Sequence, residues 1–157
     1  MTKLFLAASF SFWAAAAAAD TFTIGVDVNA LDFGGQLPGA NASLGGAGYF
    51  NEVTTISDHN AAYYLKIYDT APLTSGSRAI PNSCFRWLTT YTDGAGTLNY
   101  VDGHTFDTTP ILAYTAAGAD LTGTAVHTRF RYTVVVPDNQ VAGTYLTTVI
   151  YLLTETL

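Results

Sequence analysis

The sequence has 157 residues, of which 49% are hydrophobic, 13% aromatic and only 11% charged, and its formal net charge is −6. This length allows one domain with a sizeable core, and the abundance of aromatic and β-branched residues excludes an intrinsically disordered chain. Six basic residues against twelve acidic ones give no footprint for a nucleic-acid backbone, so binding to DNA or RNA is excluded too. A surface so poor in charge is unusual for a protein that stays dispersed as a monomer.

The first 19 residues have the pattern of a secretory signal peptide. A short cationic start contains Lys3, an apolar run extends from Leu4 to Ala19, and small residues precede Asp20. The apolar run is shorter than the roughly 20 residues that a membrane-spanning helix needs. We therefore expect cleavage near Ala19, secretion to the cell surface, and no membrane association after cleavage.

Alternating apolar and polar residues dominate the rest of the chain, and this period of two predicts β-strands. The first segment is Thr21–Asn29, in which one face carries Phe22, Ile24, Val26 and Val28. A stretch rich in Gly and Pro follows it and is suited to act as a hinge. The beginning of the mature chain is therefore expected to be a strand that could move relative to the rest.

The middle of the chain contains two candidate hairpins. Residues 49–56 and 61–68 form the first one across a polar turn, and residues 84–92 and 97–101 form the second one across a Gly-rich turn. Alternation within the third of these strands places four side chains on one face, namely Phe85, Trp87, Thr89 and Tyr91.

Three more strands complete the predicted secondary structure, at residues 111–115, 124–136 and 144–154. No segment after the signal peptide has the apolar spacing of a helix. The predicted fold is therefore all-β, an antiparallel immunoglobulin-like (Greek-key) β-sandwich with an N-terminal extension strand, and a closed barrel is the alternative. The predicted division of the chain is a signal peptide (1–19), an N-terminal strand (20–33) and a β-sandwich domain (34–157).

The residues that could carry chemistry do not form a catalytic pattern. The carboxylates that could serve in hydrolysis all lie in turn-like surroundings, at Asp93, Asp102, Asp107 and Asp120. The spacing of Asp102, His104 and Asp107 matches neither a zinc site nor a calcium loop. Cys84 is the single cysteine and cannot form an internal disulfide. We predict no enzymatic activity, no cofactor and no metal site.

Three stretches of the chain resemble a known class of domain. Residues 26–39 contain a strand followed by Leu-x-Phe-Gly and Pro-Gly, residues 80–83 read Ile-Pro-Asn-Ser, and residues 130–137 and 142–151 resemble a closing hairpin of the form strand, Val-Pro, Gly-Thr-Tyr, strand. These motifs are similar to those of secreted immunoglobulin-like sandwich domains in prokaryotic surface and filament proteins, of the pilin-like donor-strand type. The resemblance implies the fold and a cell-surface location, and implies no activity.

Two functions are compatible with these observations. In the first, the chain is a structural subunit of an extracellular filament or surface layer, and its partners are other copies of itself. The strand with Phe22, Ile24, Val26 and Val28 is then added to a neighbouring subunit, head to tail, by donor-strand exchange. In the second, the chain is a monomeric carbohydrate-binding or adhesion module, and surface polysaccharide stacks on an aromatic platform drawn from Tyr63, Tyr64, Tyr68, Trp87, Tyr91 and Tyr100.

Overall fold

The structure is a computed structural model that describes residues 20–44 and 50–157. The predicted signal peptide and Tyr49, the first residue of a predicted strand, lie outside the described residues. The described chain contains no α-helix, and no helix in it is long and apolar enough to span a membrane. Its strands are β1 (Phe22–Val26), β2 (Asn41–Leu44), β3 (Asn51–Ser57), β4 (Tyr64–Asp69), β5 (Leu73–Ser75), β6 (Arg78–Ile80), β7 (Phe85–Thr92), β8 (Thr97–Leu98), β9 (His104–Thr105), β10 (Ile111–Thr115), β11 (Val126–Val135) and β12 (Val149–Thr154).

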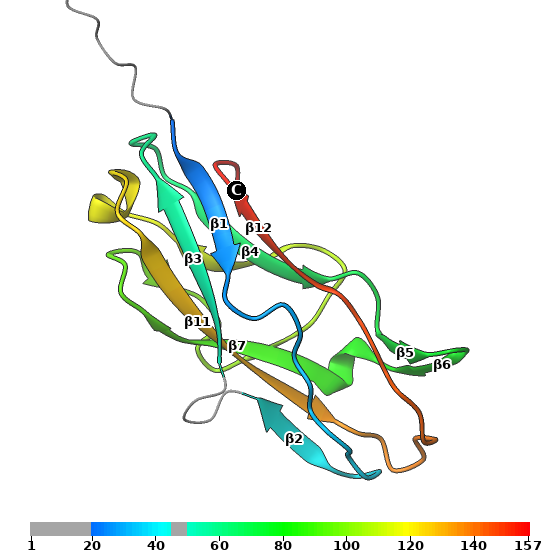
Figure 1. Cartoon of the computed structure of the whole chain (residues 1–157). Coiled ribbons are helices and arrows are strands. Elements are labelled where there is room, and N and C mark those ends of the chain that lie inside the picture. The colour runs from blue at the N-terminus through cyan, green and yellow to red at the C-terminus, as the bar shows by residue number, and fades with distance from the viewer. Residues whose placement is uncertain (1–19, 45–49) are drawn as a thin grey trace, which may run out of the picture.

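These strands form two main sheets and one small ribbon (Figure 1). The first sheet has the order β1-β3-β11-β7-β9, with β2 also paired to β11; the second has the order β12-β4-β10-β8; and β5 pairs with β6. All pairs of strands are antiparallel. The predicted all-β antiparallel sandwich is therefore confirmed, whereas its immunoglobulin-like Greek-key topology stays a prediction.

Strand β11 runs through the centre of the first sheet, and its sequence explains why. It pairs with β3, β7 and β2, and every second side chain is buried. The buried face carries the residues expected from the alternation, namely Val126, Thr128, Phe130, Tyr132 and Val134. A ten-residue strand with one largely apolar face is stable only where a second sheet covers that face. Strands β4 and β10 provide this cover with Leu65, Ile67, Ala113 and Tyr114.

The two predicted hairpins are wrong as pairings, although their strands exist. Strands β3 and β4 lie in different sheets, and so do β7 and β8. The Thr55 hydroxyl lies 3.1 Å from the Tyr63 hydroxyl in the buried space between the sheets. Alternation identifies which face of a strand is buried. It does not identify the strand that pairs with it, because the next strand in the sequence can lie in the opposite sheet, across the core. The closing hairpin implied by the resemblance is corrected for the same reason, because β11 and β12 belong to opposite sheets.

The predicted face of β7 is correct for three of its four residues. Phe85, Trp87 and Thr89 are buried, but Tyr91 is exposed. The register against β11 shifts at this point, because Phe130 faces Thr89 while Arg129 faces Tyr91. This β-bulge adds one residue and turns Tyr91 to the outer face, where the Arg129 guanidinium lies 4.6 Å from the ring centre.

Asp69 is a buried carboxylic acid at the end of β4. Its Oδ1 atom accepts a hydrogen bond of 3.0 Å from Asn82, and its Oδ2 atom has no partner in the described chain. Burial raises the pKa of Asp69 above the usual value for an aspartate. The folded state therefore retains this proton to a higher pH than the unfolded state does, so stability is lost as the pH rises through the raised pKa.

Asp69→Asn is accordingly expected to stabilise the sandwich at neutral pH by up to about 1 kcal/mol, because it removes the charge while the carbonyl oxygen can still accept from Asn82. Urea unfolding of both proteins between pH 4 and pH 8 measures the effect. The difference in the free energy of unfolding should shrink toward acid pH, where Asp69 of the wild type is protonated. Equal pH dependence of the two proteins would contradict this role for the carboxyl group.

Candidate assembly site at the N-terminal arm

Strand β1 occupies the outer edge of the first sheet. It pairs only with β3, from Phe22 opposite Ser57 to Val26 opposite Val53. Main-chain hydrogen bonds at the two ends of this pairing join Asp58 N–H to the Thr21 carbonyl and Asp27 N–H to the Glu52 carbonyl, both at 3.1 Å. Because main-chain groups alternate in direction along a strand, those of the even-numbered residues of β1 face away from β3. In the described chain no strand pairs with that second edge.

Three of the four predicted donor residues, Phe22, Ile24 and Val26, lie on the inner face of β1. Val28 lies beyond its end, because the strand is shorter than the predicted 21–29 and stops at Val26. The four side chains are buried unequally. The ring of Phe22 stacks on the His59 ring at 5.2 Å between centres and lies edge-on to the buried Tyr63 ring at 6.3 Å. Ile24 and Val26 remain 38% exposed, and Val28 remains 36% exposed. Phe22 is therefore the anchor of β1, while the other three side chains are only partly covered within their own subunit.

We call residues 20–33 the N-terminal arm. Residues 28–38, which include the second half of the arm, form no main-chain hydrogen bond with any strand of the described chain. The chain is bound again at Gly39, whose N–H donates to the Val136 carbonyl at 2.9 Å. Between these points only Phe33 packs on the core, edge-on to Phe85 with ring centres 6.1 Å apart. The arm is thus held by one short strand, by hydrogen bonds of the Asp58 and Asp27 carboxylates at its two ends, and by two aromatic anchors, Phe22 and Phe33.

The segment after the arm has the features of a hinge. Gly34 has a φ of +67° and Gly39 a φ of +78°, which few other residues adopt without strain. The Asp32 carboxylate accepts the Gly34 N–H at 2.8 Å and closes the first of these turns. The Gly-rich, Pro-containing stretch predicted as a hinge therefore connects the arm to β2 through two positions of unusual backbone conformation.

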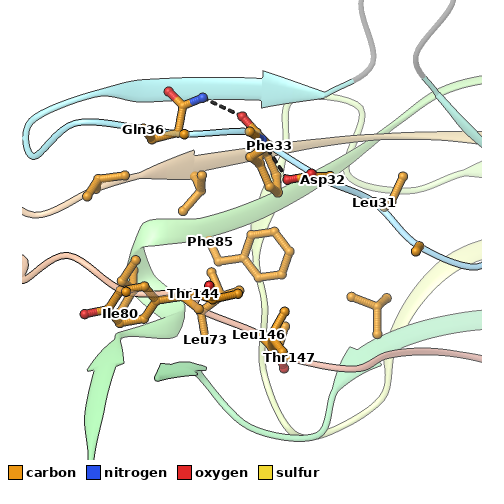
Figure 2. A pocket seen from close by; sticks show the side chains of 18 of the residues that line it. Leu31, Asp32, Phe33, Gln36, Leu73, Ile80, Phe85, Thr144, Leu146 and Thr147 are labelled. Atoms are coloured by element: carbon orange, nitrogen blue, oxygen red, sulfur yellow. Dashed lines mark hydrogen bonds between the residues drawn. The ribbon is translucent and has the colours of Figure 1, made fainter. Parts of the chain in front are cut away.

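A groove of about 1140 Å³ runs between the arm and the segment that leads into β12 (Figure 2). Residues 26–38 form one wall and residues 140–149 form the other. Phe85 and Phe33 meet in the groove, and Leu73 and Ile80 lie on its floor near Thr144. The groove is therefore the open seam between the edges of the two sheets, which the arm covers incompletely.

The groove is apolar and almost uncharged. Asp32 is the only charged residue that lines it within the described chain, and its carboxylate is already engaged by the Gly34 N–H. Large apolar side chains stand exposed along both walls, with Leu37 78% and Leu146 68% exposed. An open apolar seam of this kind is a surface that gains free energy when another chain covers it.

Comparison with known proteins assigns no family to this chain. No family model, no curated protein and no solved structure matches it. What the arm can do therefore follows from its own geometry: an edge strand that is weakly held can pair with the same edge of another molecule.

Ionisable side chains gather where the arm begins. The His59 ring nitrogen Nδ1 lies 2.5 Å from the Glu155 carboxylate, and Asp58 accepts the Thr21 N–H at 2.7 Å. The ligand atoms of Asp20, Asp58 and His59 lie within 4.8 Å of one another, and the described chain contains no other such group of potential metal ligands. From the sequence, the segment with Asp58 and His59 is predicted only as a polar turn, because the contacts with Asp20 and Glu155 depend on tertiary structure.

Three of the carboxylates considered for catalysis, those of Asp93, Asp107 and Asp120, are engaged in hydrogen bonds of their own. Asp120 is buried and accepts hydrogen bonds from the Tyr114 hydroxyl at 2.5 Å and from Ala95 N–H at 2.8 Å, so it fastens two turns to β10. The Asp93 carboxylate is hydrogen-bonded to the His127 ring nitrogen Nδ1 at 2.7 Å. His104 bonds the neighbouring Thr105 carbonyl at 2.6 Å, and no cluster of metal ligands forms around it in the described chain.

The proposed aromatic platform is divided between the core and the surface. Tyr63 and Trp87 are fully buried and cannot stack on a sugar from solvent. Tyr91 and Tyr100 are both 43% exposed, whereas Tyr64 and Tyr68 are half-buried on the outer face of β4. A carbohydrate-binding module stays a prediction, but it would have to do without the two buried rings.

Proposed function

We propose that this chain is a secreted structural subunit of an extracellular filament or surface layer, and that it assembles by adding its N-terminal strand to a neighbouring copy. The observation that carries the proposal is the placement of β1 at the sheet edge, on an arm that is followed by a hinge. Ile24 and Val26 of β1, and Val28 just after it, are each more than a third exposed. The low charge of the whole chain supports it, because a surface that neighbours cover needs little charge.

Exchange of the arm between copies would cost little free energy once the arm has opened. The neighbour offers the same β3 edge, the same Tyr63 and His59 rings for Phe22, and the same Phe85 ring for Phe33. Contacts made in the closed subunit are thus remade between subunits, as in a domain swap. Rotation of the backbone in the hinge, residues 34–39, would redirect the arm from its own subunit to the neighbour.

The geometry of donation favours an open chain of subunits. Each copy gives its arm to one neighbour and receives an arm from another, so the two surfaces in contact are different and need not close into a ring. In such an assembly the two walls of the groove belong to different subunits, since the arm forms one wall and residues 140–149 form the other. The occupant we assign to this seam is therefore the arm of a second copy.

Cysteine pairs test whether β1 of one copy reaches β3 of another. Gly25 lies opposite Thr54, and a Cβ atom added at Gly25 would meet no atom within 4 Å. Directly paired residues have Cα atoms about 5.5 Å apart, which a disulfide can bridge. In a Cys84→Ser background, a mixture of Gly25→Cys and Thr54→Cys proteins is expected to form a covalent heterodimer on mild oxidation, seen by non-reducing electrophoresis.

Two controls make this test specific. Ser77→Cys, in the exposed turn between β5 and β6, replaces Thr54→Cys as the partner of Gly25→Cys and should give only background dimer. The double variant Gly25→Cys/Thr54→Cys, oxidised as a monomer, should close a disulfide within one copy and remove it from assembly. A mixture that yields no more heterodimer than the Ser77 control, together with wild-type protein that shows no filaments in electron micrographs at high concentration, would contradict the proposal.

A further inference from the structure

We infer that β12 is a second assembly surface, on which the β12 strand of another copy adds antiparallel to the second sheet. The contact itself does not depend on exchange of the arm, but its role in a filament or layer rests on the proposed function. The inference starts from the edges of the two main sheets. In the described chain β8 and β9 contain two residues each and β2 contains four, while β1 belongs to the arm. Strand β12, with six residues, is the longest of these edge strands.

One side of β12 is open along its whole length. The strand lies at the outer edge of the second sheet and pairs only with β4 in the described chain, without a shift of register (Figure 1). The Thr70 N–H donates to the Thr148 carbonyl at 3.0 Å, so the even-numbered residues of this segment direct their main-chain groups toward β4. The main-chain groups of the odd-numbered residues therefore face the open side, namely those of Val149, Tyr151 and Leu153.

Nothing in the sequence of β12 protects this edge. Edge strands in natural proteins are commonly protected by charged residues, by proline, by a bulge or by being very short. Strand β12 reads Val-Ile-Tyr-Leu-Leu-Thr and has none of these features. None of its six side chains is fully buried, and that of Leu152 is 38% exposed. An uncharged edge of this kind is a template for another strand.

The strand matches a second copy of itself. An antiparallel pair related by a two-fold axis at Tyr151 places Val149 of each copy opposite Leu153 of the other. Because these three residues direct their main-chain groups to the open side, each opposed pair exchanges two hydrogen bonds. On the outer face, Ile150 of one copy lies opposite Leu152 of the other, and such apolar pairs stabilise a sheet. The same pairing thus satisfies the main chain and covers the exposed side chains.

No like charges oppose this pairing. Glu155, the first charged residue after β12, would lie opposite the uncharged Thr147 of the other copy, and its carboxylate is already bonded to the His59 ring at 2.5 Å. The nearby Lys66 is on β4, away from the open side, and its Nζ donates to the Thr156 carbonyl at 3.2 Å. Like charges directly opposite one another destabilise a sheet, and their absence here favours an identical strand as the occupant.

The size of the contact determines what it can do. Six residues per copy are few compared with the roughly 20–30 per side of a stable interface, so free subunits should pair only transiently. In a filament built by exchange of the arm, many β12 edges belong to one assembly and pair together, which strengthens the contact without any new interaction. Pairing of β12 would therefore join filaments side by side into a bundle or layer.

Cysteine pairs trap a transient contact of this kind. In the proposed register, Ile150 and Leu152 of the other copy form a non-hydrogen-bonded pair with Cα atoms about 4.5 Å apart, which a disulfide can bridge. In the full mature chain with Cys84→Ser, a mixture of Ile150→Cys and Leu152→Cys proteins, one of them tagged, is expected to form a covalent heterodimer on mild oxidation. Ile150→Cys mixed with Thr154→Cys is the matched control on the same face and should give only background. Circular dichroism checks that each variant is folded.

The outcomes separate this contact from the proposed function. Folded proteins whose Ile150→Cys and Leu152→Cys mixture gives no more heterodimer than the control would overturn the β12 contact. If this mixture cross-links while Gly25→Cys and Thr54→Cys never do, the β12 contact stands and arm exchange fails.

A charge on the edge tests the joining of filaments. Leu152→Lys should leave filaments intact but separate them from one another in electron micrographs, because lysine protects an edge strand. Thr90→Lys adds the same charge at an exposed position of β7 and should leave them joined. Filaments of Leu152→Lys that remain joined side by side would overturn this role of β12.

Discussion

Replacing Trp87 with alanine is expected to lower the free energy of unfolding by about 3–5 kcal/mol. The side chain is fully buried, and its ring lies 5.6 Å from the Tyr100 ring, 6.0 Å from the Phe130 ring and 6.1 Å from the His104 ring, measured between centres. Alanine would leave a large cavity in the middle of the first sheet, and the surrounding strands cannot collapse to fill it. Urea unfolding followed by circular dichroism measures the loss.

Two further variants identify the cause of this loss. The buried Trp87 Nε1 atom has no hydrogen-bond partner in the described chain, so Trp87→Phe removes an unpaired donor while it keeps most of the ring, and it should cost much less than alanine. Tyr91→Ala changes an exposed ring on the same strand and should cost no more than about 1 kcal/mol. Equal unfolding midpoints for Trp87→Ala and the wild type would show that the ring does not support the core.

The result also decides how the carbohydrate hypothesis should be tested. Because Trp87→Ala is expected to weaken the whole sandwich, a loss of sugar retention in that variant would carry no information about binding. The exposed rings of Tyr91 and Tyr100 offer the direct test, since neither belongs to the buried core. Retention that survives changes at both positions would show that neither Tyr91 nor Tyr100 stacks on the sugar, and would leave only the half-buried Tyr64 and Tyr68 as candidates.

The parts of the fold that the sequence predicts are those that depend on local alternation. The buried face of β11 follows directly from its period of two, and so do Leu65 and Ile67 on β4. Strand partners were not predictable in this way, because β3 and β4 are close in sequence yet lie on opposite sides of the core. The exposure of Tyr91 depends on a bulge against β11, for which the sequence of β7 alone gives no signal.

The candidate site was predictable in part for the same reason. Alternation identified Phe22 and its neighbours as one face, and the Gly-rich stretch predicted the hinge. The second anchor, Phe33, had a signal in the Leu-x-Phe-Gly motif, but its partner Phe85 is distant in sequence. His59 had no comparable signal, because its contacts are with residues near the two ends of the described chain, namely Phe22, Asp20 and Glu155.

Deleting the N-terminal arm, residues 20–33, is expected to abolish assembly while leaving a folded sandwich. No residue of the arm belongs to the buried core of the described chain, so the deletion removes partly covered side chains and one edge strand. Circular dichroism should show the strand signal of the remaining sheets, and electron micrographs should show no filaments. Filaments formed by the truncated protein would contradict arm exchange, because it would then have no strand to donate.

A synthetic peptide of residues 20–33 extends this test to the acceptor. It should bind the truncated subunit, because the β3 edge, the His59 and Tyr63 rings and the Phe85 ring are left without the arm. Phe22→Ala or Phe33→Ala in the peptide removes one anchor and should weaken binding about tenfold, as measured by fluorescence anisotropy, whereas Asn29→Ala changes an exposed residue and should not. The bound peptide should stabilise the subunit without restoring filaments, since the peptide is not attached to a second subunit and cannot link one copy to the next. A folded truncated subunit that ignores the peptide would show that the arm has no separable binding surface, and the surplus of exposed apolar side chains along the groove would then need a different partner.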